Sequence, residues 1–285
     1  MGQLLGLHML ATADYSSFYS QLGDYAPMSL LTLFFLGIAR IIPIVVFAPF
    51  FGSKLPSGVK MGLSVSMTII FLPHITMRSQ TIPDFNSLYI ILFIKELFIG
   101  FILGLLVSVP FYVALSAGSL IDFLRGSSSL QVTDPSSQEQ TSPIGILYNY
   151  MLIVIFYNLN GPLMLFDGIL DSYNIIPADG LINPLFFQMK QPIWELIMGV
   201  LSKLIALSIQ LSAPALLAIL MTEVFLGIAN RLAPQVQIVF LGMSLKSLIG
   251  LSVLCAAWMF ILQQLGKETF LWMKEVNNIF QTTRT

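Results

Sequence analysis

Six long apolar runs constrain the fold of this 285-residue chain more than any other feature. They cover residues 28–51, 59–77, 88–121, 144–170, 193–228 and 236–262. A helix that crosses a bilayer needs roughly 20 predominantly apolar residues, and the runs are of that length or longer. Hydrophobic residues make up 56% of the chain, more than a single water-exposed fold would bury. We therefore expect an all-α membrane protein with six or more apolar helices.

Turns and prolines indicate how these helices are arranged. Residues 52–58 have the composition of a turn, so the first two runs are predicted to form a helical hairpin. The third and fifth runs exceed a single span, and they contain Pro110 and Pro214. Because proline removes a helical hydrogen bond and clashes with the preceding turn, we expect kinked or broken helices in both runs.

The last 20 residues differ in character from the rest. Within residues 266–285, Phe270, Met273, Val276 and Phe280 recur at helical spacing among charged side chains. This pattern predicts an amphipathic tail that lies on the membrane surface or against a partner. We therefore separate a membrane domain, residues 1–265, from this tail.

The polar insert at residues 126–143 points to a function. Helices in a compact bundle are usually joined by a few residues, so a longer connection rich in Ser and Gln needs a reason to exist. Irregular backbone is tolerated at membrane depth only where protein or water satisfies its N–H and C=O groups. The insert is therefore either a solvated surface connector or a plug in an aqueous passage.

Five residues of the insert would do the work of such a plug. Leu130 and Val132 are its only aliphatic side chains, so they are predicted to seal the passage. Gly126, Asp134 and Pro135 are turn-forming residues, and Asp134 with Pro135 would fix the turn that aims the two aliphatic side chains.

Charged residues within the apolar runs need partners. Placing such a residue in the middle of a bilayer costs roughly 2.5 to 3.5 kcal/mol. Arg40, Lys95 and Glu96 are in this position. Lys95 and Glu96 are neighbours in sequence, so we expect that they do not face one another on a helix. The alternative to burial is that these side chains snorkel to the membrane surface.

A further polar face occurs near the end of the fifth run. Glu223, Gly227, Asn230 and Arg231 share one side of a helix, but Glu223 and Arg231 are two turns apart and too distant to pair. Their partners are expected on other segments or subunits, and the face is predicted to serve assembly. If the charges are buried in pairs, removing one should cost about 3 to 5 kcal/mol. The alternative is an ordinary solvated helix end.

Four further observations narrow the class of protein. Two glycine pairs, Gly58 with Gly62 and Gly100 with Gly104, have the spacing that lets helices pack closely. No HExxH, GxSxG or GxxxxGK[ST] motif is present, so we expect no enzyme, no cofactor and no metal site.

Cys255 lies in an apolar run, where we expect a small buried side chain, and a single cysteine excludes an intrachain disulfide. The net charge of -1 without a basic stripe argues against nucleic acid.

Five stretches in a fixed order carry a family resemblance. They are Ala39-Arg40 followed by Ala48-Pro49, Gly52 and Pro56; Lys95 to Gly104; AGSLIDFLRG at 117–126 with Asp134-Pro135 and Ser142-Pro143; DSYNIIP at 171–177; and SAPALLAILMTEVFLGIANRLAPQ at 212–235. Together they resemble the SctT family of type III secretion systems, whose flagellar counterpart is FliR. The resemblance covers about residues 30–262. The FDGILDSYNIIP stretch and the Gln-rich insert favour the secretion branch over the flagellar one.

The resemblance implies an export-gate subunit of the bacterial inner membrane. Such a subunit joins SctR-like and SctS-like subunits in a portal for unfolded secreted proteins, with membrane lipid around it. The insert at 126–143 would be the plug of the closed gate. The C-terminal tail would face the cytoplasm near an SctU-like switch subunit.

Two other classes remain open on the residues alone. A secondary transporter or ion channel would use broken helices and intramembrane charges, with Glu96 or Glu223 as a proton or cation site. A membrane enzyme is a more distant alternative. A transporter should purify by itself as a functional unit, whereas a gate subunit should be unstable without its partners.

Overall fold

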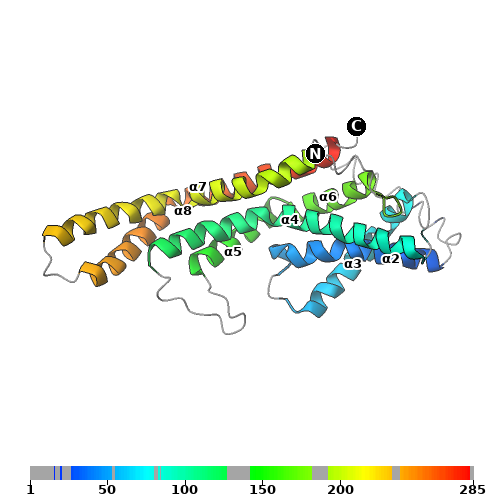
Figure 1. Cartoon of the computed structure of the whole chain (residues 1–285), viewed down its shortest axis with the longest axis horizontal. Helices are drawn as coiled ribbons and strands as arrows, with labels where there is room; N and C mark the ends of the chain where they lie inside the picture. The colour runs from blue at the N-terminus through cyan, green and yellow to red at the C-terminus, as the bar shows by residue number, and fades with distance from the viewer. Residues whose placement is uncertain are drawn as a thin grey trace. The chain divides into compact units, whose positions relative to one another are not determined.

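The computed structural model describes residues 27–52, 55–79, 83, 85–126, 142–181, 192–232 and 238–282, together with Ser16 and Ser20. Its elements are α2 (Pro27–Phe47), the short 3-10 helix η2 (Pro49–Phe51), α3 (Ser57–Arg78), α4 (Ser87–Leu124), α5 (Pro143–Asn158), α6 (Gly161–Ile175), α7 (Pro192–Leu232) and α8 (Ile238–Thr282) (Figure 1). Five of these helices are long and apolar enough to cross a membrane, or six if α5 and α6 together form one span. The described residues thus confirm an all-α membrane protein.

Of the two alternatives expected for the third and fifth apolar runs, a kinked or a broken helix, the structure excludes a break at Pro110 or Pro214. Both α4 and α7 continue through their internal prolines, Pro110 and Pro214, as single helices. The break falls in the fourth run, where α5 and α6 meet at a bend of 73°. Asn160 adopts a positive φ of 56° at this bend, a conformation that Asn tolerates better than most residues. Pro162 follows in the first turn of α6, where proline is compatible with a helix. A residue that ends one helix is therefore followed closely by a proline that suits the start of the next. A proline within a helix, by contrast, leaves most of the helical hydrogen bonds in place.

The chain forms two compact units. Unit 1 comprises residues 1–108, 162–197 and 273–285, and unit 2 comprises residues 109–161 and 198–272. In unit 1, α2 and α3 form the predicted hairpin, and a Cβ atom at Gly37 would lie 2.8 Å from Thr68 on α3.

The helices α2 and α4 run parallel in unit 1. At one end the Tyr89 hydroxyl donates to the Thr32 carbonyl over 3.0 Å. At the other end the Ser108 hydroxyl donates to the Phe47 carbonyl over 2.9 Å. The helix α6 joins this group, because Phe166 packs edge-on against Phe71 of α3. These contacts bring α2, α3, α4 and α6 together around the side chains of the candidate site.

Unit 2 contains two antiparallel helix pairs. The end of α4 packs on the start of α5 through Gly118 and Gly145. The other pair is α7 with α8, in which Leu226 approaches Gly242 and Ile219 approaches Gly250. Both pairs agree with the expected arrangement in helical hairpins.

The predicted C-terminal tail belongs to a longer helix. Its described residues continue α8 without interruption to Thr282. Met273 and Val276 are buried within the chain, Phe270 is exposed, and the Phe280 side chain lies outside the described part. Cys255, expected to be buried, is exposed on α8. That expectation was wrong because an apolar neighbourhood in sequence does not decide which face of a helix is covered.

Candidate functional site

A buried ion pair joins α2 to α4 in unit 1. The Arg40 Nε atom donates to Glu96 Oε2 at 2.5 Å, and Nη2 donates to Glu96 Oε1 at 2.8 Å. Neither side chain is exposed. The guanidinium also lies over the ring of Tyr173 on α6, 3.8 Å from its centroid. This two-pronged geometry is the strong form of an Arg–carboxylate interaction.

The remaining donors of this cluster point at the end of α6. Arg40 donates to the Ser172 hydroxyl at 2.9 Å and to the Ile176 carbonyl at 2.8 Å. The Lys95 ammonium donates to the carbonyls of Pro177, Ala178 and Gly180 at 2.8, 3.0 and 2.8 Å. Carbonyls at and beyond a helix C-terminus lack intrahelical partners and attract cations. The two basic side chains therefore fix the segment after α6 to α2 and α4.

Lys95 and Glu96 contact each other despite being adjacent in sequence. The Lys95 Nζ atom lies 2.8 Å from Glu96 Oε1. The expectation that they would not face one another was wrong. The Cβ atoms of adjacent residues point in different directions on a helix. The lysine side chain is long and flexible, however, so its ammonium can still contact the neighbouring carboxylate.

The cluster satisfies its own charges. Glu96 uses both oxygens, one toward Arg40 and the other toward Arg40 and Lys95. The Lys95 ammonium also donates to three backbone carbonyls, which offset the cost of removing this charge from water. Both oxygens of Glu96 are thus engaged within the chain, which argues against Glu96 as a site for a transported proton or cation.

A second polar cluster flanks the insert in unit 2. Asp122, near the end of α4, accepts from the Ser142 hydroxyl at 2.5 Å and from the Ile144 backbone N–H at 2.9 Å. Its other oxygen pairs with Arg125 at 2.6 Å. Asp122 was not among the site residues predicted from the sequence. The available signal was Ser142-Pro143, a helix N-cap followed by proline at the first helical position.

The predicted plug residues lie mostly outside the described part of the chain. Leu130, Val132, Asp134 and Pro135 are in this category. Gly126 is described, and it ends the turn after α4 with a φ of +87°, a left-handed conformation that favours glycine. The sealing role of the insert therefore stays a prediction.

The polar face of α7 is open in this chain. Glu223 pairs with Lys246 of α8 at 2.7 Å, and 54% of the Glu223 side chain is exposed. Asn230 and Arg231 are also exposed, at the end of α7. The partner of Glu223 thus lies on another segment. The cost estimated for breaking a buried pair does not apply to this half-exposed pair within the chain alone.

The two glycine pairs occupy different environments. A Cβ atom at Gly100 would overlap the Arg40 carbonyl oxygen, and one at Gly104 would lie 3.0 Å from the Pro43 oxygen. These glycines allow α4 to approach the backbone of α2. Around Gly58 and Gly62 of α3, a Cβ atom would meet nothing within 4 Å. Only the pair on α4 supports packing within the described chain.

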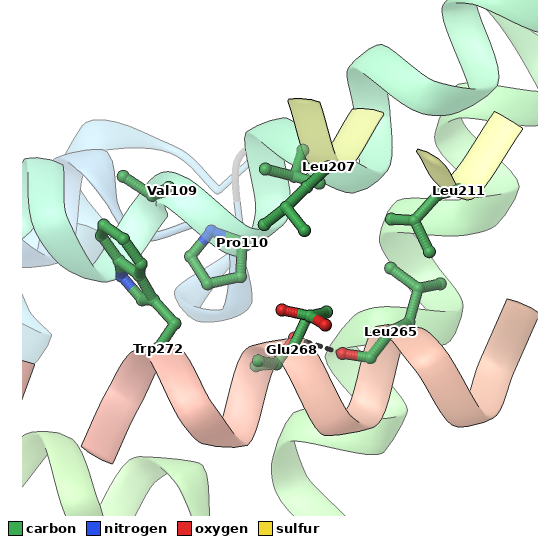
Figure 2. Close-up of a pocket in the computed structure, with 9 residues that line it drawn as sticks. Val109, Pro110, Leu207, Leu211, Leu265, Glu268 and Trp272 are labelled. Atoms are coloured by element: carbon green, nitrogen blue, oxygen red, sulfur yellow. Dashed lines mark hydrogen bonds between the residues drawn. The ribbon is translucent and has the colours of Figure 1, made fainter. Parts of the chain in front are cut away.

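A pocket in unit 2 lies among α4, α7 and α8. Nine residues line it, and the side chains of Pro110, Leu207, Leu265 and Trp272 converge there (Figure 2). Its carboxylate, Glu268, accepts from Gln264 of the same helix at 2.8 Å. The lining is otherwise largely aliphatic and offers no chemistry for a specific ligand, so we assign the pocket to helix packing.

Comparison with known proteins gives consistent matches along most of the chain. The family described as "Bacterial export proteins, family 1" matches residues 31–271. The chain is 28% identical over 220 residues to the surface presentation of antigens protein SpaR of Shigella flexneri, covering 75% of this chain and 80% of that protein. It is 26% identical over 258 residues to the Yop proteins translocation protein T of Yersinia pestis, covering 90% and 97%. It is also 26% identical over 234 residues to the flagellar biosynthetic protein FliR of Escherichia coli, covering 80% and 85%.

Proposed function

Because this chain belongs to the bacterial export proteins of family 1, the FliR/SctT family of type III export apparatus, we propose that it is an export-gate subunit of a type III secretion system. It is a multi-pass membrane protein of the export apparatus. In the proposed role it forms part of an inner-membrane portal through which unfolded proteins enter the secretion channel. The family match over residues 31–271 is the observation that carries this proposal.

The buried charges support an export subunit over a transporter. Glu96 pairs with Arg40, and Arg40 and Lys95 donate to backbone carbonyls after α6. These contacts stabilise unit 1 from within. The other acidic residue considered for ion binding, Glu223, already pairs with Lys246. The pairing of both acidic residues within the chain therefore favours the export subunit over the transport alternative.

Exposed apolar surface supports assembly with other membrane subunits. On α7 the side chains of Met221, Phe225 and Leu232 are 65%, 64% and 81% exposed. Lipid alone can cover such residues, but the same region carries the half-exposed Glu223–Lys246 pair, which lipid solvates poorly. SctR-like and SctS-like subunits are the proposed partners of this surface, with an SctU-like subunit near the C-terminal end.

Partner identity tests the assembly. The tagged chain is extracted from membranes in a mild detergent, and co-purifying proteins are identified by mass spectrometry. We expect SctR-like and SctS-like subunits in a fixed ratio, visible as one assembly by native mass spectrometry. A well-folded solitary chain would contradict the proposal.

The plug is tested separately by conductance. Deleting residues 128–138 should leave the complex assembled and make a reconstituted bilayer permeable to small ions. A matched control keeps the length but replaces only Leu130 and Val132 by Ser, which should also conduct if these side chains form the seal. If the complex with the deletion is intact and its conductance is unchanged, the insert is a connector and not a plug.

A further inference from the structure

The junction between α4 and α5 is held by direct backbone contact. A Cβ atom at Gly118 would overlap the backbone of Ile144 and Gly145, and one at Gly145 would lie 2.8 Å from the Leu115 carbonyl oxygen. The last turns of α4 and the first turn of α5 therefore touch without intervening side chains. Such close packing defines where α5 starts relative to α4.

Asp122 adds a polar connection across this junction. One carboxylate oxygen accepts from both the Ser142 hydroxyl and the Ile144 N–H, and Ser142 in turn accepts from the Gly145 N–H at 3.0 Å. A carboxylate of α4 thus satisfies a free N–H group at the start of α5 and holds the side chain that satisfies another. Arg125 neutralises the second carboxylate oxygen. Asp122 is only 4% exposed, so water competes weakly for these bonds.

We propose that Asp122 is a positioning residue that holds the end of α4 and the start of α5 at a fixed separation. The connection at 127–141 leaves α4 and returns to α5 on either side of this contact. Because Asp122, Ser142 and Ile144 all lie outside the connection, their contact holds the two helix ends between which the connection runs. The inference rests on the proposed function for its consequence, because a plug closes reproducibly only if both of its attachment points are fixed.

The chemistry of the site requires an aspartate. One oxygen of the carboxylate accepts from a hydroxyl and a backbone N–H, and the other forms an ion pair with the Arg125 guanidinium. Asparagine can keep the two hydrogen bonds, but its neutral NH2 group would face the positively charged Arg125. Asp122→Asn should therefore weaken the junction partly, and Asp122→Ala should remove the polar connection completely.

Spin-label distances test the positioning without reference to conductance. Phe123 and Leu147 are exposed on α4 and α5, so Cys substitutions there, in a Cys255→Ser chain, carry labels in the assembled complex. We expect a narrow distance distribution with Asp122, a broader one with Asp122→Asn and the broadest with Asp122→Ala. Ser119→Ala is the matched control, since the Ser119 hydroxyl donates only to Leu115 of its own helix, at 2.8 Å. An unchanged distribution in Asp122→Ala would overturn the proposal.

A reversible covalent link tests the consequence. In the Cys255→Ser chain, Asp122→Cys combined with Ser142→Cys replaces the hydrogen bond by a disulfide that can be opened and closed on the same complex. Reduced complexes should show about tenfold more open time in a bilayer, the factor expected for losing a hydrogen bond to a charged group. Oxidation should return conductance to the parent value.

The outcomes separate the two proposals. If the 128–138 deletion conducts but the reduced disulfide variant does not differ from the parent, the plug stands, and the proposed effect of Asp122 on its closure is overturned. If the deletion does not conduct, the plug fails, and the label distances alone then support or overturn the fixed separation.

Discussion

Arg40 and Glu96, which are 56 positions apart in the chain, form a two-pronged ion pair that is completely buried between α2 and α4. The same carboxylate also contacts Lys95. One acidic residue is therefore paired with two buried cations. This relationship makes Glu96 the most sensitive single position in unit 1, because its carboxylate is paired with both buried cations.

Glu96→Gln should destabilise the chain strongly. The change removes the carboxylate that pairs with both Arg40 and Lys95 in a buried setting, and breaking a buried pair in this way costs about 3 to 5 kcal/mol. Thermal unfolding of the purified protein in detergent measures it. Glu268→Gln serves as the control, because that carboxylate accepts from Gln264 on its own helix. Equal melting temperatures for the two variants would contradict the central role of Glu96.

Lys95→Met should loosen the segment after α6. The ammonium donates to three carbonyls between Pro177 and Gly180, and methionine removes these bonds while keeping a long side chain. Hydrogen exchange followed by mass spectrometry should show faster exchange of peptides covering 176–181. Lys267→Met, at an exposed position of α8, should leave that exchange unchanged. Unaltered exchange in Lys95→Met would show that the segment is held by packing alone.

Gly100→Ala and Gly62→Ala should have opposite outcomes for the isolated chain. The added methyl at Gly100 overlaps the Arg40 backbone and forces α2 and α4 apart, at a cost of about 1 to 3 kcal/mol. At Gly62 the methyl meets open space and helix propensity improves. The measurement is the melting temperature in detergent, before partners are added. If Gly62→Ala instead reduces complex yield, a partner helix covers that face of α3.

Glu223→Gln and Lys246→Gln should each reduce the yield of assembled complex, and the double variant should restore it. Each single change leaves one charge without its partner where another subunit is proposed to pack, whereas the double change removes both. Native mass spectrometry of the purified assembly gives the yield. The melting temperature of the chain alone should shift little, since exposed pairs contribute roughly 0 to 1 kcal/mol. Normal assembly of both single variants would leave this region as an ordinary solvated helix end.

The sequence predicted the helical class and the hairpins, because apolar runs of membrane length and a turn-rich gap are local features. It also predicted that Arg40 and Glu96 need partners, but it could not pair them, since nothing local connects positions 56 apart. Gly62 and Gly100 show the same four-residue spacing and differ only in what covers them. The carbonyls that bind Lys95 come from residues with no polar side-chain signature, so backbone partners of this kind could not be predicted from side-chain types.

The apolar surface of α8 has a consequence for the supply of this protein in the cell. In the most apolar 18-residue stretch of α8 only 17% of the residues are buried within the chain, whereas 56% are buried in the corresponding stretch of α4. A copy made without partners would present this helix to lipid and to membrane proteases for its whole lifetime. We therefore expect the steady-state amount of the protein to follow the abundance of the subunits that cover α8. Overproducing this chain alone should then lead to its degradation and should not increase the number of assembled export gates.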